Sequence, residues 1–335
     1  MDLNKDILWV FSHSNPSSIP SYVFSGILPA DYLNIQKVIF LRDHDPREIL
    51  TRFNPKLIII NKAMHTNVVN LARIAKELNI KVISIFDDWY FIKPESRDMQ
   101  IMYYAGFYKY RFIDNLKLAE YSNDIIAKTK NAADIIHKHT GFRAKIISDC
   151  VRFESQMPIN KINYPFKISW FGMNTNHDTL EFGIREILEY DFEANIKIIT
   201  NEFDIIRSKL SNLNLKNISL EFIKWKKSMD KEVVTTDIVI IPYLNDHVRL
   251  VKSYNRITDS INLGRFTIIS DLNHLRKFKN YCFLGNIGEG LKWSKENNLL
   301  AVEKVKKGFE YIKKNYSVAT IAMEWKNIIY QNLKK

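Results

Sequence analysis

Cations and a predicted helix start are spaced for anion binding within the stretch Ile238–Asp271. Lys252 lies in a loop, and Arg256 falls on the first turn of a helix predicted over roughly Tyr254–Leu263. The free N–H groups and the macrodipole of a helix N-terminus favour anions, and the two cations add positive charge. Asp259, one turn further in, can accept hydrogen bonds from ribose hydroxyls. The spacing therefore predicts a site for a sugar-linked diphosphate.

Two polar residues beside these cations complete the predicted site. Ser253 fits the N-cap of the helix, where a hydroxyl oxygen accepts a hydrogen bond from the first turn, and Asn255 opens the helix. The alternative for the whole stretch is an ordinary strand–helix–strand unit with cations on a solvated face. For Asp259 the alternative is a first-turn acid that the helix dipole favours.

The elements that must hold these residues alternate between strands and helices. In the first half of the chain, short runs rich in Ile and Val are separated by amphipathic stretches such as Thr66–Leu78 and Ala132–His139. This alternation is typical of parallel βαβ units whose sheet is covered on both faces. The strands predicted here are Ile7–Phe11, Val38–Leu41, Leu57–Ile60, Lys81–Phe86, Asp124–Ala127 and Lys145–Ser148.

The alternation breaks at Phe153–Phe166, where Pro158, Pro165 and polar residues indicate a linker. We therefore predict an α/β protein of two doubly wound Rossmann-like domains that face each other across a cleft. The predicted parts are residues 1–152, a linker over 153–166, residues 167–316 and a C-terminal helix over 317–335. The second series of strands is Lys167–Phe171, Ile196–Thr200, Ser219–Ile223, Asp237–Ile241, Phe266–Ile269 and Tyr281–Leu284.

Composition limits the partners and the compartment. The net charge of +12 favours anionic partners, which include phosphorylated ligands, nucleic acid and acidic membrane surfaces. The two cysteines, Cys150 and Cys282, are far apart and fit a reducing compartment. No apolar run reaches the roughly 18–20 residues of a membrane-spanning helix, and the acidic N-terminus is unlike a signal peptide. We expect a cytoplasmic protein.

Five stretches form a series of landmarks along the chain. Ser122–Val151 contains a strand, a helix, a Thr-Gly turn and a further strand, and Lys167–Leu180 contains a strand followed by a glycine loop. Phe222–Tyr243 precedes the KSYNR…D…G stretch, and Ser317–Leu333, with Trp325, closes the chain. In this order they resemble the landmarks of GT-B glycosyltransferases, the two-Rossmann-domain enzymes of bacterial cell-surface polysaccharide pathways.

The resemblance implies a nucleotide-sugar donor in the C-terminal domain and a glycan or lipid-linked acceptor in the N-terminal domain. The closing helix would cross back onto the N-terminal domain. Lys252 and Arg256 would hold the leaving nucleoside diphosphate, whose negative charge grows in the transition state. The resemblance also implies that no metal and no cofactor is needed, since the nucleotide sugar is a substrate, and the sequence has no clustered metal-ligand pattern.

The sequence departs from the family pattern at three places. Val251 occupies the position of the first of two carboxylates that the large retaining family carries eight residues apart, with Asp259 at the second. The proline that follows the motif glycine in the family is missing, since Gly264 is followed by Arg265, Phe266 and Thr267. The first loop, Ser12–Pro20, has no paired glycines. These changes leave the donor sugar and the stereochemistry open.

Further donor-site residues are expected after the strands of the second domain. Gly172 would let the backbone approach a phosphate, and Asn174 and His177 could then reach the sugar or phosphate. The alternative is a turn built from residues that tolerate unusual dihedral angles. Trp225 and Tyr243 flank the predicted base pocket and could pack on a nucleobase, although aromatic residues at strand ends also fill cores and rims.

Three residues of the first domain are candidate catalytic groups. Asp87 and Asp88 end the strand VISIF, and His13 ends the first strand. Ligands of parallel sheets bind at the carboxyl ends of strands, so either carboxylate could act as general base for an acceptor hydroxyl or simply bind it. The alternatives are a helix cap for the two aspartates and a structural role for the histidine.

The stretch Ile101–Tyr121 interleaves Tyr and Phe with Lys109, Arg111 and Lys117. Aromatic and basic residues together suit an anionic bilayer interface, so we predict a peripheral contact with the inner face of the cytoplasmic membrane. The alternative is an amphipathic helix packed on its own domain. The same interleaving could stack nucleic-acid bases, but no nucleic-acid motif accompanies it and no nucleic-acid partner is expected.

Two other functions fit the same predicted fold. A nucleotide-sugar epimerase would act on the donor without an acceptor and would show several carboxylates and histidines in its cleft. A non-catalytic binding subunit would keep the fold and bind nucleotide weakly or not at all. A nucleic-acid binder would instead show steep salt dependence of oligonucleotide binding.

Overall fold

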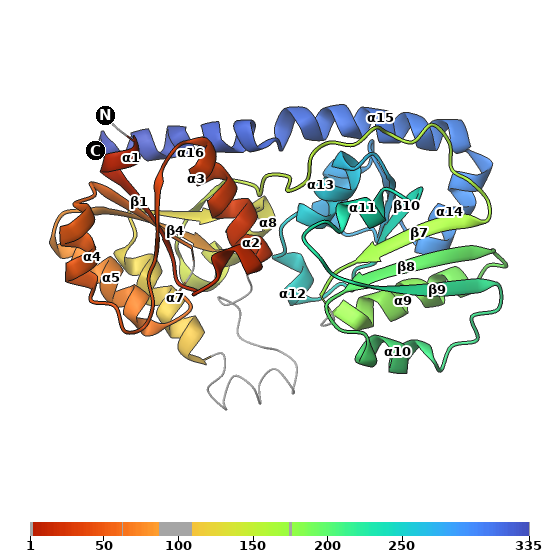
Figure 1. Ribbon diagram of the computed structural model, residues 1–335, viewed down its shortest axis with the longest axis horizontal. Helices are drawn as coiled ribbons and strands as arrows, with labels where there is room; N and C mark the ends of the chain where they lie inside the picture. The colour runs from red at the N-terminus through yellow and green to blue at the C-terminus, as the bar shows by residue number, and fades with distance from the viewer. Residues whose placement is uncertain (1–2, 62, 87–108, 174–175, 335) are drawn as a thin grey trace. The chain divides into compact units, whose positions relative to one another are not determined.

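The computed structural model describes residues 3–61, 63–86, 109–173 and 176–334, with the side chains of residues 109–111, 247 and 248 left out. The chain divides into two compact units (Figure 1). The first unit combines Met1–Arg152 with Leu250–Tyr254 and Tyr316–Lys335, and the second combines Phe153–Arg249 with Asn255–Asn315.

The first unit is built on a parallel sheet of six strands in the order β2-β1-β3-β4-β5-β6. The strands are β1 (Ile7–Phe11), β2 (Gln36–Ile39), β3 (Leu57–Asn61), β4 (Lys81–Phe86), β5 (Asp124–Ala127) and β6 (Ala144–Ile146). The helices are α1 (Leu3–Asp6), α2 (Pro20–Tyr22), α3 (Leu28–Tyr32), α4 (Pro46–Phe53), α5 (Thr66–Glu77), α7 (Lys109–Tyr121), α8 (Lys130–Thr140) and α16 (Val318–Leu333), with a π-helix over Val23–Ile27 and a 3₁₀ turn over Pro16–Ser18.

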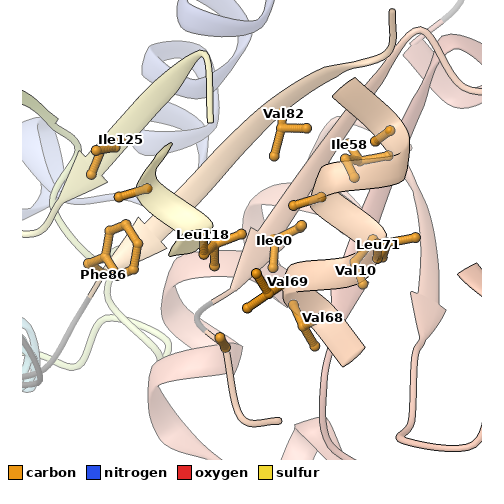
Figure 2. Close-up of a cluster of buried hydrophobic side chains, with 14 of the residues drawn as sticks. Val10, Ile58, Ile60, Val68, Val69, Leu71, Val82, Phe86, Leu118 and Ile125 are labelled. Atoms are coloured by element: carbon orange, nitrogen blue, oxygen red, sulfur yellow. The ribbon is translucent and has the colours of Figure 1, made fainter. Parts of the chain in front are cut away.

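Both faces of this sheet are buried, which explains why its strands are continuous apolar runs. Along β1, Leu8 and Val10 belong to one hydrophobic cluster, while Trp9 belongs to the cluster on the opposite face because side chains alternate along a strand. Figure 2 shows the first cluster, in which Val68 and Leu71 of α5 lie among the strand side chains.

The C-terminal helix α16 covers the second face. Trp325 of α16 packs edge-on against Trp9 of β1, with ring centroids 4.9 Å apart. The Lys128 ammonium lies 5.8 Å from the ring centre of Trp325 and 3.4 Å from the Asp149 carboxylate, and the side chains of Lys128 and Asp149 are buried. The helix begins after Ser317, whose side-chain oxygen accepts a hydrogen bond from the Thr320 N–H at 3.2 Å.

The second unit contains another parallel sheet of six strands, in the order β12-β11-β10-β7-β8-β9. The strands are β7 (Phe166–Phe171), β8 (Ala194–Thr200), β9 (Ile218–Lys224), β10 (Ile238–Ile241), β11 (Phe266–Ile269) and β12 (Phe283–Leu284). The helices are α9 (His177–Leu188), α10 (Asp204–Leu210), α11 (Asp230–Val233), α12 (His247–Leu250), α13 (Asn255–Asn262), α14 (Ile287–Glu296) and α15 (Asn298–Asn315), with a 3₁₀ helix over Asn273–Phe278.

All twelve predicted strands form, with their ends shifted by one to two residues at several places. Shifts of two residues occur at both ends of β2, at the end of β6 and at the start of β8, and β12 keeps only its last two predicted residues. The N–H groups of Tyr281 and Cys282 donate to the Phe278 carbonyl instead, so this stretch turns rather than extends.

The stretch predicted as a linker has no helix or regular strand before Phe166, but it packs against the second unit. Ile159 and Ile162 join the hydrophobic core of that unit. The Ile159 N–H donates to the Gly264 carbonyl at 3.0 Å. Gly264 has φ +68°, and a Cβ there would lie 2.6 Å from the Cα of Pro158. The packed segment thus needs glycine directly after α13.

Candidate anion-binding site

The sheet of the second unit changes its direction of winding between β7 and β10. The chain runs from β7 outward through β8 to β9, and then returns to β10 on the other side of β7. β7 and β10 are paired, with Ile168 opposite Ile238. Ligands of doubly wound sheets bind at the carboxyl ends of the strands at such a switch point.

Arg256, on the first turn of α13, lies at this switch point on the faces of three aromatic rings. Its guanidinium carbon is 5.3 Å from the ring centre of Trp170, 5.7 Å from that of Phe171 and 5.9 Å from that of Tyr243. Phe171 ends β7, and Tyr243 follows β10 by two residues. Rings at these distances attract a cation through their π faces.

The guanidinium of Arg256 has no carboxylate partner among the described residues. Its Nε and Nη2 are buried, and neither makes a hydrogen bond to any of those residues. Burial lowers the pKa of Arg256, Tyr243 acts in the opposite direction, and the nearby cation Arg249 lowers it further. The Nε1 of Trp170 is also buried and has no hydrogen-bond partner among the described residues. Arg256 and Trp170 therefore hold N–H donors that the described residues do not satisfy, and Arg256 adds a positive charge.

Gly172 leaves space beside this guanidinium. A Cβ at this position would lie 3.0 Å and 3.1 Å from two ring atoms of Trp170 and 3.7 Å from the guanidinium carbon of Arg256. A side chain there would fill the approach to the cation. The predicted close approach of a phosphate to the Gly172 backbone stays a prediction.

Arg249 is a second cation near the site, and the sequence analysis did not single it out. Its guanidinium contacts both carboxylate oxygens of Asp178 at 2.8 Å, and Asp246 at 2.7 Å. Asp246 is three residues away and could have been noticed, whereas Asp178 is 71 residues away and gives no local signal. Two carboxylates contact Arg249, whereas the buried Nε and Nη2 of Arg256 contact none among the described residues.

The glycine loop after β7 is described only in part. Asn174 lies outside the described residues. His177 is the first residue of α9, and its Nδ1 is buried with no hydrogen-bond partner in the described chain. Its predicted contact with a sugar or phosphate stays a prediction.

Trp225 and Tyr243 lie at the same edge of the sheet but are not in one pocket. Trp225 follows β9, and Tyr243 follows β10, with β7 and β8 between them. Three strand spacings correspond to about 14 Å. The two aromatic residues therefore mark separate positions along the edge, which an elongated ligand could span.

The remaining predicted donor-site residues fall into two groups. Lys252 and Ser253 lie in Leu250–Tyr254, which belongs to the first unit, whereas Arg256 belongs to the second. In that segment Asn131 donates to the Leu250 carbonyl at 2.5 Å, and Val251 is buried in the core of the first unit. The position of the missing family carboxylate is thus a packed valine.

The helix start differs from the prediction for Ser253. Helix α13 begins at Asn255, so Tyr254 rather than Ser253 precedes it. Asn255 supplies the polar atoms there, because its side-chain oxygen accepts from the Arg256 N–H at 2.8 Å and its carbonyl accepts from the Thr258 hydroxyl at 3.1 Å. Asp259 is only 2% exposed, and its predicted contact with a ribose stays untested.

Of the catalytic candidates, Asp87 and Asp88 lie outside the described residues. His13 is half-buried after β1, and its Nδ1 accepts a hydrogen bond from the Asn15 N–H at 3.1 Å. That bond uses the Nδ1 lone pair and places the proton of the neutral ring on Nε2. To act as a base through Nε2, His13 would have to give up this hydrogen bond.

In the predicted membrane segment Ile101–Tyr121, residues 101–108 lie outside the described residues, and residues 109–121 form α7, with side chains described from Phe112 on. Its described end, from Phe112, packs in the first unit, where Leu118 is buried and Asp114 accepts a hydrogen bond from the Thr66 hydroxyl at 3.0 Å. No helix in the described part of the chain is long and apolar enough to cross a bilayer. Within that part, no three His, Cys, Asp or Glu side chains are grouped so that they could hold a metal ion.

Comparison with solved structures identifies the architecture. Sucrose-phosphate synthase from Thermosynechococcus elongatus matches 97% of this chain and 98% of its own at a TM-score of 0.75 and 10% identity. The catalytic domain of starch synthase IV from Arabidopsis thaliana matches 98% and 99% at a TM-score of 0.63 and 9% identity. A proposed UDP-N-acetylglucosamine 2-epimerase from Listeria monocytogenes matches 99% and 97% at a TM-score of 0.55 and 9% identity.

These matches confirm the predicted fold class, an α/β protein with two doubly wound units of the GT-B type. At 9–10% identity they establish the fold and not the reaction. No protein-family model and no curated protein sequence matches the chain.

Proposed function

We propose that this protein is a glycosyltransferase that moves a sugar from a nucleotide-sugar donor to a glycan or a lipid-linked acceptor. The observation that carries the proposal is the guanidinium of Arg256 at the switch point of the second sheet, whose buried Nε and Nη2 have no hydrogen-bond partner among the described residues. A buried cation without a counter-ion is costly, so its retention points to an anion that arrives with the ligand. The starch synthase neighbour holds ADP and acarbose, a nucleoside diphosphate and a sugar.

Catalysis would rest on stabilising the leaving diphosphate. Negative charge grows on the oxygen that leaves the sugar, and a preorganised guanidinium in a water-poor position stabilises that charge most. The aromatic faces of Trp170, Phe171 and Tyr243 hold the guanidinium without consuming its N–H donors. Lys252 remains a proposed second ligand for the diphosphate, and Trp225 a proposed platform for the base.

The first unit would bind the acceptor. Asp87, Asp88 and His13 are the proposed groups for accepting the proton of the acceptor hydroxyl or for binding it. We propose that the product belongs to a bacterial surface polysaccharide and that the reaction needs neither a metal nor a cofactor. The proposed compartment is the cytoplasm.

A nucleotide-sugar epimerase is the second candidate, because one structural neighbour is a proposed enzyme of that class. An epimerase needs the same diphosphate site but no acceptor. It would release or rearrange the donor sugar on its own, which gives a direct way to separate the two functions.

The test is to incubate the protein with UDP-, ADP-, GDP- and TDP-linked sugars and measure nucleoside diphosphate release with and without glycan acceptors. Acceptor-dependent release supports the transferase. A rearranged sugar without acceptor supports the epimerase, and binding of none of the nucleotides contradicts both. Arg256→Met should abolish the activity, whereas Arg185→Met should not, because Arg185 is an exposed arginine of the same unit.

We also propose that the protein contacts an anionic membrane surface at its periphery. In the described chain, Leu299 and Leu300 at the start of α15 are 86% and 51% exposed. Exposed lysines lie within eight residues of them in the chain, together with the exposed Glu296 and Glu303. Apolar side chains beside lysines suit an anionic interface. These lysines are Lys292, Lys295, Lys306 and Lys307.

Vesicle co-sedimentation tests this contact. The protein should bind vesicles that contain phosphatidylglycerol and not vesicles of phosphatidylcholine alone, and Leu299→Glu with Leu300→Glu should abolish binding. Ile205→Glu, at a 49% exposed isoleucine elsewhere in the unit, is the matched control. Equal binding by the leucine variant and the control would contradict the contact.

A further inference from the structure

A cavity of about 840 Å³ lies in the second unit beside helix α15. Its lining comes from the turn before β12 and from helices α14 and α15, and it includes Asn280, Tyr281, Trp293 and Glu310. Cavities of about 300–1,000 Å³ are typical of sites for small molecules. No site residue predicted from the sequence lines this cavity.

The cavity and Arg256 lie at opposite ends of the strands. Trp293 packs against Phe266 and Phe283, with ring centres 6.0 Å and 5.7 Å away. These two residues begin β11 and β12, so Trp293 lies near the amino-terminal ends of those strands. Arg256 instead lies on the ring of Phe171, the last residue of β7. A ligand in the cavity would therefore not compete with the proposed diphosphate.

Two half-buried aromatic side chains, Tyr281 and Trp293, line the cavity. The ring of Tyr281 stacks on that of Tyr311 with ring centres 4.3 Å apart, which leaves its other face for a ligand. Gly308 lets α15 approach this residue closely, since a Cβ there would lie 3.0 Å from the Cβ of Tyr281. Aromatic side chains that their neighbours already hold lose little entropy on binding, and their faces pack against the C–H groups of a sugar ring.

The charged groups of the lining supply both donors and acceptors. Glu303 and Lys307 form an ion pair, with 2.6 Å between Oε1 and Nζ. The Lys304 ammonium donates to the Lys279 carbonyl at 2.6 Å and lies 6.0 Å from the ring centre of Trp293. These contacts place ammonium and carboxylate groups beside the aromatic faces.

Asn280 and Glu310 add exposed polar groups to the same cavity. An amide donates and accepts hydrogen bonds, a carboxylate accepts them and an ammonium donates them. A sugar hydroxyl both donates and accepts, so this mixture can satisfy several hydroxyls at once. Lipid phosphates would fit the cavity less well, because the carboxylates of Glu303 and Glu310 would repel them.

We propose that this cavity binds an oligosaccharide, apart from the site where sugar transfer would take place. It would hold the chain of a glycan acceptor or product while the reacting end lies elsewhere on the protein. A second contact of this kind raises the effective concentration of the reacting end without any new contact there. The inference deepens the proposed function and, for the identity of the ligand, rests on it.

Calorimetric titration in the absence of nucleotide tests the proposal, with maltohexaose, cellohexaose, chitohexaose and hexagalacturonate as probes. The native protein should bind at least one of them with a Kd below about 1 mM. The double variant Asn280→Ala with Glu310→Ala should weaken this binding about tenfold, because hydrogen bonds to an amide and to a charged acceptor are lost. Tyr281→Ala, checked for folding by thermal unfolding, should weaken it by a similar factor.

The matched control is Glu154→Ala with Asn160→Ala, two exposed residues of the same unit outside the cavity, and it should bind as the native protein does. If the cavity variants bind as tightly as this control, or if the native protein binds none of the four hexasaccharides, the inference is wrong. Loss of phosphatidylglycerol vesicle binding in the Asn280 and Glu310 variant, with no sugar binding, would assign the cavity to the membrane contact instead.

The two proposals fail in different experiments. If the native protein bound no nucleotide, the proposed function would be contradicted. The sugar titrations contain no nucleotide, so they would still show whether the cavity is a saccharide site.

Discussion

Two arginines lie near the two ends of helix α13, and their surroundings differ: Arg265 is buried, whereas Arg256 is half-buried with its Nε and Nη2 atoms buried. Arg265, three residues beyond the helix, donates to four backbone carbonyls at 2.8–3.1 Å, those of Met157, Val234, Thr236 and Leu263. Arg256, on the first turn, lies on aromatic faces, and its Nε and Nη2 find no acceptor within the described chain. Burial lowers the pKa of both guanidinium groups.

We interpret the difference as one between a structural arginine and an arginine that is available to the proposed ligand. Arg265 ties the packed segment before β7 to the loop before β10 and to the end of α13, so removing it would leave several buried carbonyls unpaired. Burial lowers the pKa of Arg265, and the nearby Asp237 acts in the opposite direction. For Arg256 the opposing influence comes from Tyr243 and no carboxylate contributes. In the proposed function, its charge is balanced when an anion binds.

The largest expected effect on stability is at Arg265. Arg265→Met should lower the free energy of unfolding by about 3–5 kcal/mol, because a buried network loses its donor and the carbonyls stay buried. Urea unfolding measured by tryptophan fluorescence checks this value. The control Arg185→Met, at an exposed ion pair, should change stability by less than about 0.5 kcal/mol. An equal loss of unfolding free energy in the two variants would contradict the structural role of Arg265.

Gly264→Ala should be the next most damaging change, at about 2–4 kcal/mol. Its positive φ of +68° costs about 1–2 kcal/mol for any side chain, and the new Cβ would lie 2.6 Å from the Cα of Pro158. Gly141→Ala is the matched control, because Gly141 has φ +77° and nothing within 4 Å of the added Cβ. The difference in stability loss between the two variants measures the cost of the contact with the packed segment at Pro158. Identical losses would mean that Pro158 can move away.

Asp178→Asn should have a smaller effect, since its ion pair with Arg249 is partly exposed. We expect a loss of stability below about 1 kcal/mol. Removal of this negative charge beside the proposed anion site should tighten binding of a nucleoside diphosphate by about two- to fivefold. Calorimetric titration measures the change. Weaker binding would show that Asp178 positions Arg249 for the ligand rather than neutralising it.

Much of the fold could be predicted from the sequence because its strands are short runs of Ile and Val, as in the IVII of β10 and the LIII of β3. When both faces of a sheet are covered, its strands are continuous apolar runs and can be recognised in the sequence. The packing of Phe153–Pro165 could not be predicted, because its prolines and polar residues resemble a linker. Ile159 and Ile162 find their core contacts only through the tertiary structure.

The candidate site was predictable to a lesser extent. Arg256 was found through its place at a helix start, which is a local signal. The environment that makes it unusual was not, because Trp170 and Tyr243 come from strands distant in sequence and only the sheet order joins them. The same holds for Arg249 and Asp178, 71 residues apart. The burial of Asp259 depends on how α13 packs, which its position in the motif does not encode.

The most direct test of the account is thermal unfolding of the native protein and of Arg256→Met, each with and without the nucleoside diphosphate that the native protein prefers. Without ligand, the variant should be as stable as the native protein or more stable by about 1–2 kcal/mol, because an uncompensated buried charge is removed. With ligand at 100 times its Kd, the native protein should gain about 2.7 kcal/mol and the variant nothing. A variant that is strongly destabilised, or that gains as much as the native protein, would contradict the assignment of Arg256 as the ligand-binding arginine.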